Sequence, residues 1–473
     1  MTKNILIFSD GTGQISGLKP DQKLSNIYKM YRAMRPGPSS PINPSDQMAY
    51  YDPGLGAGEI DGLTFRKVRQ GLEAAVGTGI DQNVIDCYEK IISYYKPGDR
   101  VLLFGFSRGA YTVRALANVM NLCGVPTKMP DGSPVPVTGP RLRALAAEGV
   151  IDVYNHGAGR PRGEKPFYAQ REEKGRRFRL KYGSAPLHGP DVQGNVQPEF
   201  IGVFDTVAAL GNSAVTWLVR STFTIVLITL LVSILLNWHL AFSITAAGLL
   251  AVTTVWYLRI VKSQIRVFSP DPGKLLKFSR IRDWASIFKN MHRAVWNRKN
   301  YDRFLDADVG YARHALAIDE HRANFPRVKW ASQSQMNRNL DKKPEWLKQV
   351  WFAGCHSDIG GSYDESEARL SDIALEWMVE ELEECVPDVQ IRKELLVCSP
   401  DALGLQHREE FMFRFGPFKM RWPVQPRIVD PGYTLHKTVF ERLSATVVPQ
   451  VGDMEAYRPV QLREHPKAKK FYK

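Results

Sequence analysis

Short, mainly apolar runs recur along the chain and lead into residues that are typical of turns. They span Ile5–Phe8, Val101–Phe104, Phe200–Phe204 and Gln349–Phe352. Runs of this length without polar alternation are typical of strands buried on both faces of a parallel sheet. Between such runs, apolar residues recur at helical spacing, as from Ala110 to Met120. This alternation predicts an α/β fold, with a mostly parallel sheet flanked by helices.

Two further segments carry weaker patterns. Residues 313–320 are predicted to form a helix. Residues 125–198 are rich in Gly, Pro, Arg and Lys and have few periodic apolar positions. We expect this second segment to run over the surface as a long excursion.

Two longer apolar runs, Ser221–Trp238 and Leu240–Leu258, contain no charged residue. Each would be about 27–28 Å long as a helix, at ~1.5 Å per residue. That length is close to the ~30 Å hydrocarbon core of a bilayer. The pattern predicts a transmembrane helical hairpin, although a hairpin buried in protein or dipping into one leaflet would read similarly.

Basic residues flank this predicted hairpin, with Arg220 before it and Arg259 and Lys262 after it. The turn between the runs has no Lys or Arg, so both flanking parts are expected on the cytoplasmic side of a membrane. The predicted organisation has three parts. They are an N-terminal part (residues 1–213), an inserted hairpin (214–266) and a C-terminal part (267–473).

Composition excludes some classes of protein. The formal net charge of +14 would suit anionic lipid or nucleic acid, but no zinc-finger spacing or base-stacking motif supports nucleic acid as a partner. The five cysteines are scattered and form no C-x-x-C pair, so no metal site is predicted. No cofactor is predicted either, and the sequence leaves the oligomeric state open.

The chemistry concentrates at Gly105-Phe106-Ser107-Arg108-Gly109, directly after a predicted strand and before a predicted helix. This is the G-x-S-x-G pattern of a nucleophile elbow, in which glycines permit a turn sharp enough to present the serine hydroxyl. The motif and its context together predict an α/β-hydrolase-like sheet with Ser107 as the nucleophile. The predicted hairpin is then an insertion in that fold.

A serine nucleophile needs an imidazole to accept its proton and a carboxylate to orient the imidazole. In this fold the three groups follow the chain order Ser, acid, His, each after a strand. Asp205 and His356 fit that order and that placement. Two rivals stay open at this stage: His436 as the base and Asp358 as the acid.

An oxyanion hole in such a site uses the backbone N–H of the residue after the nucleophile, here Arg108. The glycine-rich loop after the first strand could supply the second donor, with Gly11 or Thr12 as candidates. The residues that would bind the substrate are not predicted.

Four segments together carry a resemblance to a known family. They are Gly-Phe-Ser-Arg-Gly-Ala-Tyr-Thr-Val-Arg-Ala-Leu (105–116), Ser-Asp-Gly-Thr (9–12), Phe-Asp-Thr-Val (204–207) and His-Ser-Asp-Ile-Gly-Gly (356–361). They resemble a widespread hydrolase family, formerly catalogued as a domain of unknown function, that supplies the catalytic domain of type VI secretion phospholipase effectors. The resemblance implies an α/β-hydrolase fold, a Ser107–Asp205–His356 triad and ester hydrolysis on phospholipids.

Three functional hypotheses follow. The first is a membrane-anchored serine hydrolase that cleaves carboxylic esters of phospholipids or related lipids through an acyl-enzyme, with membrane lipids as substrate and anchor. The second keeps the fold and chemistry but takes soluble esters, the hairpin serving as a tether. The third is a non-catalytic membrane scaffold on a hydrolase fold.

Overall fold

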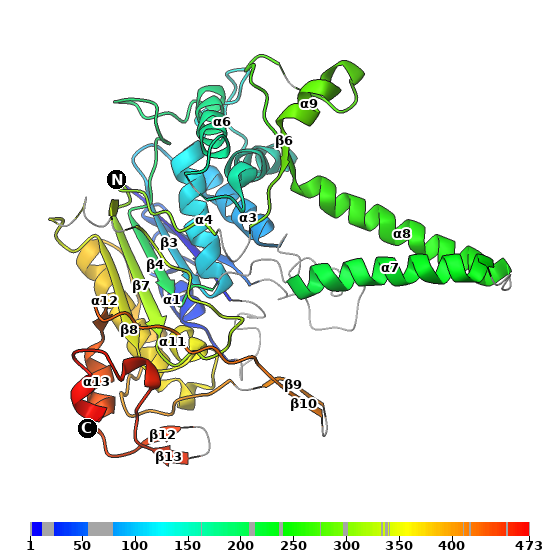
Figure 1. Cartoon of the computed structure of the whole chain (residues 1–473). Helices are drawn as coiled ribbons and strands as arrows, with labels where there is room; N and C mark the ends of the chain where they lie inside the picture. Colours follow the sequence, from blue (N-terminus) through cyan, green and yellow to red (C-terminus); the bar gives the residue numbers. More distant parts are fainter. Residues whose placement is uncertain are drawn as a thin grey trace.

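A seven-stranded parallel sheet forms the centre of the computed structural model (Figure 1). Its strand order is β11-β8-β7-β4-β3-β1-β2. The strands are β1 (Asn4–Ser9), β2 (Gln47–Asp52), β3 (Arg100–Phe106), β4 (Phe200–Phe204), β7 (Tyr311–Ala317), β8 (Leu347–Phe352) and β11 (Thr434–Leu435). The structure describes residues 2–11, 23–54, 79–161, 163–207, 213–235, 240–274, 276–296, 301–332, 334–335, 339, 341–409, 411–415, 418–450 and 453–472. The predicted mostly parallel sheet is therefore confirmed.

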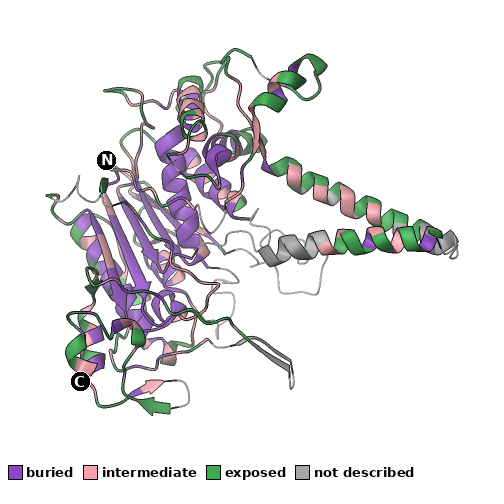
Figure 2. Cartoon of the chain, viewed as in Figure 1, coloured by how far each residue is buried: buried purple, intermediate pink, exposed green. Residues whose placement is uncertain are grey.

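Helices cover both faces of the sheet. On one face lie α1 (Asn26–Met34) and α12 (Arg369–Cys385), and on the other lie α3 (Gly79–Tyr94), α4 (Arg108–Cys123), α5 (Pro140–Ala147) and α6 (Phe167–Tyr182). Successive side chains of a strand point to opposite faces. Accordingly Ile5 and Ile7 of β1 pack with α3 and α4, whereas Leu6 and Phe8 pack with α1 and α12. Figure 2 shows this sheet and its inner helices as almost entirely buried.

Several further elements among the described residues are short. They are α9 (Trp284–Asn290), α11 (His356–Gly360), α13 (Lys437–Ser444), and three antiparallel pairs: β5 (Ile265–Val267) with β6 (Met291–Arg293), β9 (Phe411–Phe415) with β10 (Phe418–Arg421), and β12 (Val448–Gln450) with β13 (Asp453–Glu455). The C-terminal residues pack at the end of the sheet formed by β8 and β11, where Trp351 shares a buried cluster with Leu435, Val439 and Tyr457.

The helix predicted at residues 313–320 is wrong, because Tyr311–Ala317 forms strand β7 in the sheet centre. Pairing with β4 and β8 outweighs the local helical pattern. The polar residues of this strand are buried with partners. Arg313 bonds Glu381, and the ring Nε2 of His314 accepts the backbone N–H of Thr206 at 3.3 Å. Burial lowers the pKa of His314 well below its ordinary value.

The surface excursion predicted at residues 125–198 is also only partly right. It includes helices α5 and α6, and α6 packs on α4 through Phe178 and the buried Gly175. A Cβ at Gly175 would lie 2.8 Å from the carbonyl oxygen of Leu122, so only glycine permits this close helix contact.

The predicted apolar hairpin forms two helices, α7 (Ser213–Leu235) and α8 (Leu240–Gln264), which extend together away from the body as an arm (Figure 1). The prediction that they cross a membrane is wrong: among the described residues, no helix has the length and apolar character that a crossing requires. Hydroxyl side chains interrupt the apolar positions, and those of Ser233, Thr253 and Thr254 bond to carbonyls of their own helix. The predicted membrane location, with the remaining chain facing the cytoplasm, is overturned by the same finding.

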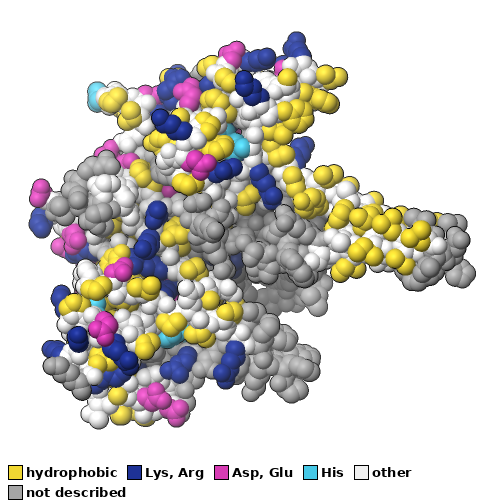
Figure 3. All heavy atoms as spheres, in the orientation of Figure 1, with side chains coloured by type: hydrophobic (Ala, Val, Ile, Leu, Met, Phe, Trp, Pro, Cys, Tyr) yellow, Lys and Arg dark blue, Asp and Glu magenta, His cyan; other side chains and the backbone are white. Residues whose placement is uncertain are grey.

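The arm nevertheless presents apolar side chains outward (Figure 3). Ile225, Leu235, Ile244, Val252 and Leu258 are each more than half exposed. An exposed apolar surface on this scale is unusual on a protein that lacks an apolar partner.

Candidate active site

Ser107 lies at the turn between β3 and α4, with φ 57° and ψ −119°. This left-handed conformation is strained for a residue with a side chain, and such strain is typical of a nucleophile elbow. The flanking glycines are required by space. A Cβ at Gly105 would lie 2.5 Å from the carbonyl oxygen of Gly109, and a Cβ at Gly109 would overlap the carbonyl of Ser9. The motif therefore brings the end of β1 against the turn that carries Ser107.

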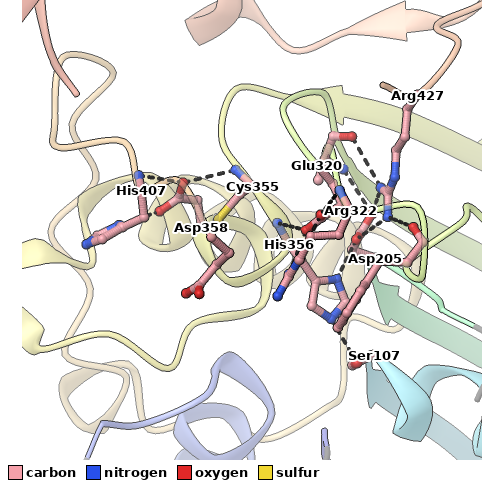
Figure 4. Close-up of polar contacts among 12 residues, drawn as sticks. Ser107, Asp205, Glu320, Arg322, Cys355, His356, Asp358, His407 and Arg427 are labelled. Atoms are coloured by element: carbon pink, nitrogen blue, oxygen red, sulfur yellow. Dashed lines mark hydrogen bonds and ion pairs between the residues drawn. The ribbon is translucent and has the colours of Figure 1, made fainter. Parts of the chain in front are cut away.

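The structure brings Ser107, His356 and Asp205 together in one line of hydrogen bonds (Figure 4). The Nε2 atom of His356 lies 2.8 Å from the Oγ of Ser107, and its Nδ1 atom lies 2.5 Å from the Oδ2 of Asp205. Asp205 follows β4 and has a positive φ of 36°, and His356 begins α11 after β8. All three residues are buried, so solvent competes little with these contacts.

Aromatic rings hold the imidazole of His356 from two sides. The ring of Phe106 stacks on it with centroids 4.7 Å apart, and Phe325 meets it edge-on at 5.3 Å. Gly360 leaves the space that Phe106 needs, because a Cβ there would overlap that ring. The ring plane is therefore set by packing as well as by its two hydrogen bonds.

A buried ion pair supports the backbone of His356. Its N–H donates to Glu320 at 3.3 Å, and Arg322 binds both carboxylate oxygens of Glu320 at 2.9 and 2.7 Å. Burial alone would raise the pKa of Glu320, but the hydrogen bond and charge of Arg322 outweigh it and hold that pKa below its ordinary value. Glu320 thus stays an acceptor at neutral pH.

A cavity of about 320 Å³ lies beside this ion pair. Its lining includes Glu320, Arg322, Cys355 and Trp422. Trp422 and Arg322 both contact Phe325, the ring that packs on His356. Phe325 is therefore the side chain that links the lining of the cavity to the imidazole of His356.

The carboxylate of Asp205 is completely buried and has three kinds of donor. His356 and the N–H of Ala317 each contact one oxygen, and the guanidinium of Arg427 binds both. Burial alone would raise the pKa of Asp205, but the charge of Arg427 and the contact with His356 hold it well below its ordinary value. The group is thus an ionised acceptor at neutral pH.

The predicted oxyanion donors have different surroundings. Arg108 is the first residue of α4, a position whose N–H has no acceptor within the helix. Gly11 lies against Ser107, since a Cβ at Gly11 would be 3.4 Å from the Cβ of Ser107, but its N–H donates to Asp10 at 2.7 Å. Thr12 lies outside the described residues.

The two rival residues make other contacts. His436 precedes α13, where its Nδ1 atom contacts Thr438 at 2.9 Å and its ring stacks on Phe352. Asp358 accepts the N–H of Cys355 and pairs with His407, whose Nδ1 atom lies 2.7 Å from its Oδ1 (Figure 4). The described contacts of Asp358 therefore stabilise the turn that carries His356 instead of orienting its ring.

Sequence reasoning missed Glu320, Arg322, Phe325 and Arg427. None belongs to a recognisable motif, and Arg427 reaches the site from a proline-rich segment 222 residues after Asp205. Within the described part of the chain, no three side chains of His, Cys, Asp or Glu gather as metal ligands would.

Comparison with known proteins adds a curated relative and two solved structures. An uncharacterized protein of Saccharomyces cerevisiae is 33% identical over 133 residues, which are 27% of this chain and 18% of that protein. A crystal structure of an uncharacterized protein from Pseudomonas aeruginosa aligns at 16% identity and a TM-score of 0.34, covering 84% of this chain and 48% of that one. The structure of the Tle1 effector bound to the VgrG spike of the type 6 secretion system aligns at 16% identity and a TM-score of 0.28, covering 78% and 53%. This chain thus corresponds to about half the length of each solved protein, and TM-scores this low add nothing to the description of its fold.

The sequence comparison with protein families is decisive. The family described as type VI secretion system phospholipase effector Tle1-like, catalytic domain, matches residues 3–245 and 279–381, well over half of the chain. The two matched ranges include Ser107, Asp205 and His356. This chain belongs to the family of Tle1-like phospholipase effector catalytic domains.

Proposed function

We propose that this protein is a serine hydrolase that cleaves carboxylic ester bonds of phospholipids or related lipids. The observation that carries the proposal is the unbroken contact from Ser107 through His356 to Asp205. Three residues far apart in the chain meet with the spacing that proton transfer requires. Membership of a phospholipase family supports a lipid as the substrate.

The chemistry follows from this arrangement. As the Ser107 oxygen attacks the ester carbonyl, its proton passes to Nε2 of His356, and the Asp205 carboxylate stabilises the resulting imidazolium. The carbonyl oxygen becomes an oxyanion, to which the N–H of Arg108 donates; Gly11 can add a second donor once its N–H leaves Asp10. The imidazolium then protonates the departing alcohol, leaving an acyl group on Ser107. A water molecule, deprotonated by His356, releases the fatty acid and restores the serine.

Two further features support a lipid over a soluble ester. The arm exposes a row of apolar side chains, a surface suited to contact with aggregated lipid. The basic net charge of +14 suits anionic head groups near the protein. We also propose that residues 1–213 and 267–473 form one hydrolase unit interrupted by residues 214–266, since β1 to β4 belong to the same sheet as β7, β8 and β11.

The test compares Ser107→Ala with Ser371→Ala. Ser371 is another buried serine, whose hydroxyl donates to the carbonyl of Ala368, away from the site. Purified proteins are assayed with long-chain phospholipid and with a short-chain ester, and are labelled with a fluorophosphonate probe. We expect Ser107→Ala to lose labelling and all turnover while Ser371→Ala keeps both. Full turnover in folded Ser107→Ala would refute the mechanism, and turnover of the short-chain ester alone by the wild type would refute the lipid substrate.

A further inference from the structure

Arg427 meets the carboxylate of Asp205 in a two-pronged contact (Figure 4). Its Nη1 atom lies 2.5 Å from Oδ1 and its Nη2 atom lies 2.9 Å from Oδ2. Both side chains are almost fully buried, with 4% and 1% of their surface exposed. This is the fork geometry in which a guanidinium binds a carboxylate most specifically.

The same guanidinium is itself held in place by the chain. Its Nη1 atom also donates to the carbonyl of Ala317 at 3.2 Å, and its Nη2 atom donates to the carbonyl of Phe325 at 3.0 Å. Ala317 ends β7 and also donates its N–H to Asp205, while Phe325 packs on the ring of His356. Arg427 therefore joins the acid, the strand end beside it and the ring that packs on the base.

We infer that Arg427 is a positioning residue that keeps the Asp205 carboxylate ionised and turned toward Nδ1 of His356. This role rests on the proposed serine-hydrolase function. An ionised carboxylate buried here without a cationic partner would destabilise the folded state. It would therefore rotate away from His356 or take up a proton. Arg427 removes both options, because it occupies the lone pairs that face away from His356.

The position of Arg427 in the chain sharpens the inference. The family match ends at residue 381, so the segment that carries Arg427 lies beyond it. The three triad residues lie within the matched ranges. This protein thus completes the support of its acid with a residue from its C-terminal part, which the match does not include.

The arrangement also affects how activity depends on pH. Charged or titratable groups that face the acid and base are Arg427, His314 on β7, and the Glu320–Arg322 pair beside the backbone of His356. Of these, Arg427 is the one whose charge directly contacts Asp205. Its positive charge opposes a second positive charge on the nearby imidazole. Loss of this charge alters the electrostatics around Asp205 and His356 together, so the pH profile of activity is expected to differ between Arg427→Met and the wild type.

The experiment compares Arg427→Met and Arg427→Lys with the matched control Arg442→Met. Arg442 is another buried arginine of the C-terminal part, but its guanidinium donates to the backbone carbonyls of Ala402, Gly404 and Pro449. The full chain is used, and the readout is the second-order rate of Ser107 labelling by a fluorophosphonate between pH 5 and 9. Turnover of a soluble ester, separated into kcat and KM, is measured in parallel.

We expect Arg427→Met to lower the labelling rate and kcat by about 10- to 100-fold, an effect of the size that loss of a hydrogen-bond partner has on the ligands of metal sites. KM should change little, and the pH profile should differ from that of the wild type. Arg427→Lys keeps the charge but not the fork, so its pH profile should match that of the wild type while kcat falls. If Arg427→Met does not fold, the kcat and labelling rate of Arg427→Lys serve as the test.

Three results would overturn the inference. They are unchanged kcat and labelling in a folded Arg427 variant, an equal loss in Arg442→Met, and a full additional loss when Arg427→Lys is placed in an Asp205→Asn background. The last would show that Arg427 does not act through Asp205. Absence of labelling in the wild type is a distinct outcome, because it refutes the serine-hydrolase proposal itself.

Discussion

The Nε2 atom of His356 lies 2.8 Å from the hydroxyl oxygen of Ser107, although 249 residues separate the two in the chain. The parallel sheet brings these two residues together. Ser107 follows β3, His356 follows β8, and the carboxyl ends of parallel strands share one edge. Residues at that edge are therefore neighbours whatever their distance in sequence.

Replacing His356 with alanine should abolish catalysis, because no other described base contacts Ser107. Loss of a triad histidine costs on the order of 10⁶-fold in kcat in a serine protease. The control is His436→Ala, whose ring lies against Phe352. Ester turnover should fall to background in the first variant and stay within about threefold of wild type in the second. The reverse result would make His436 the base.

Asp205→Asn should lower kcat by about 10⁴-fold, since an amide cannot hold the required tautomer of the imidazole. It should also destabilise the protein, because the buried charge of Arg427 loses its partner. Asp358→Asn, which disturbs the contact with His407, should lower stability with a much smaller effect on kcat. Parallel urea denaturation and ester assays separate the two effects. If Asp358→Asn were the more damaging to kcat, Asp358 would be the acid.

The turn at Ser107 depends on close backbone contact at Gly109. Gly109→Ala adds a methyl group that overlaps the carbonyl of Ser9. We expect a loss of about 1–3 kcal/mol in the free energy of unfolding, typical of overpacking, together with loss of esterase activity. Gly37→Ala is the control, because a Cβ there meets nothing within 4 Å. Equal stability of the two variants by chemical denaturation would contradict this account of the motif.

The free energy of unfolding should fall as pH rises, because the Asp52 carboxyl loses its proton at different pH values in the folded and unfolded states. Burial raises the pKa of this carboxyl from 3.8 to about 7, despite hydrogen bonds from Ser9 and Asn83. Between these values the folded state keeps a proton that the unfolded chain has released, so folding is favoured at low pH and the benefit is lost as pH approaches 7. The slope is at most about 1.4 kcal/mol per pH unit.

Asp52→Asn removes this titration. Its free energy of unfolding should decline between pH 5 and pH 8 by about 2 to 3 kcal/mol less than that of the wild type, as measured by urea denaturation. The exposed Asp453→Asn should follow the wild-type curve. Parallel curves for wild type and Asp52→Asn would show that this carboxyl does not titrate in that range.

The exposed apolar arm should matter only for aggregated substrates. Ile225→Gln combined with Val252→Gln removes two outward apolar side chains. We expect severalfold slower turnover of dispersed long-chain phospholipid, with unchanged turnover of a dissolved short-chain ester. Leu187→Gln with Val192→Gln, also exposed but outside the arm, is the control. An equal loss on both substrates would point to a folding defect instead.

The sequence by itself determined the local features of this protein. The turn at Ser107 follows from Gly105 and Gly109, because a Cβ at either position would overlap backbone atoms. The strands at Ile5–Phe8 and Phe200–Phe204 follow from short apolar runs. The positions of Asp205 and His356 at strand ends were also within reach, because a parallel sheet brings such positions to one edge. The geometry agrees with those predicted neighbours, while their catalytic roles stay predictions.

Only the tertiary structure decided the rest. Residues 311–317 form a strand because β4 and β8 supply hydrogen bonds on both sides, which no local pattern records. The length of the apolar runs at 221–258 predicted a membrane crossing, yet the helices that form do not meet that requirement. No local sequence pattern marked Arg427 as part of the site. An arginine in a proline-rich segment becomes the partner of Asp205 only when the C-terminal part folds back over the sheet edge. Contacts between distant segments depend on packing, and packing is a property of the whole chain.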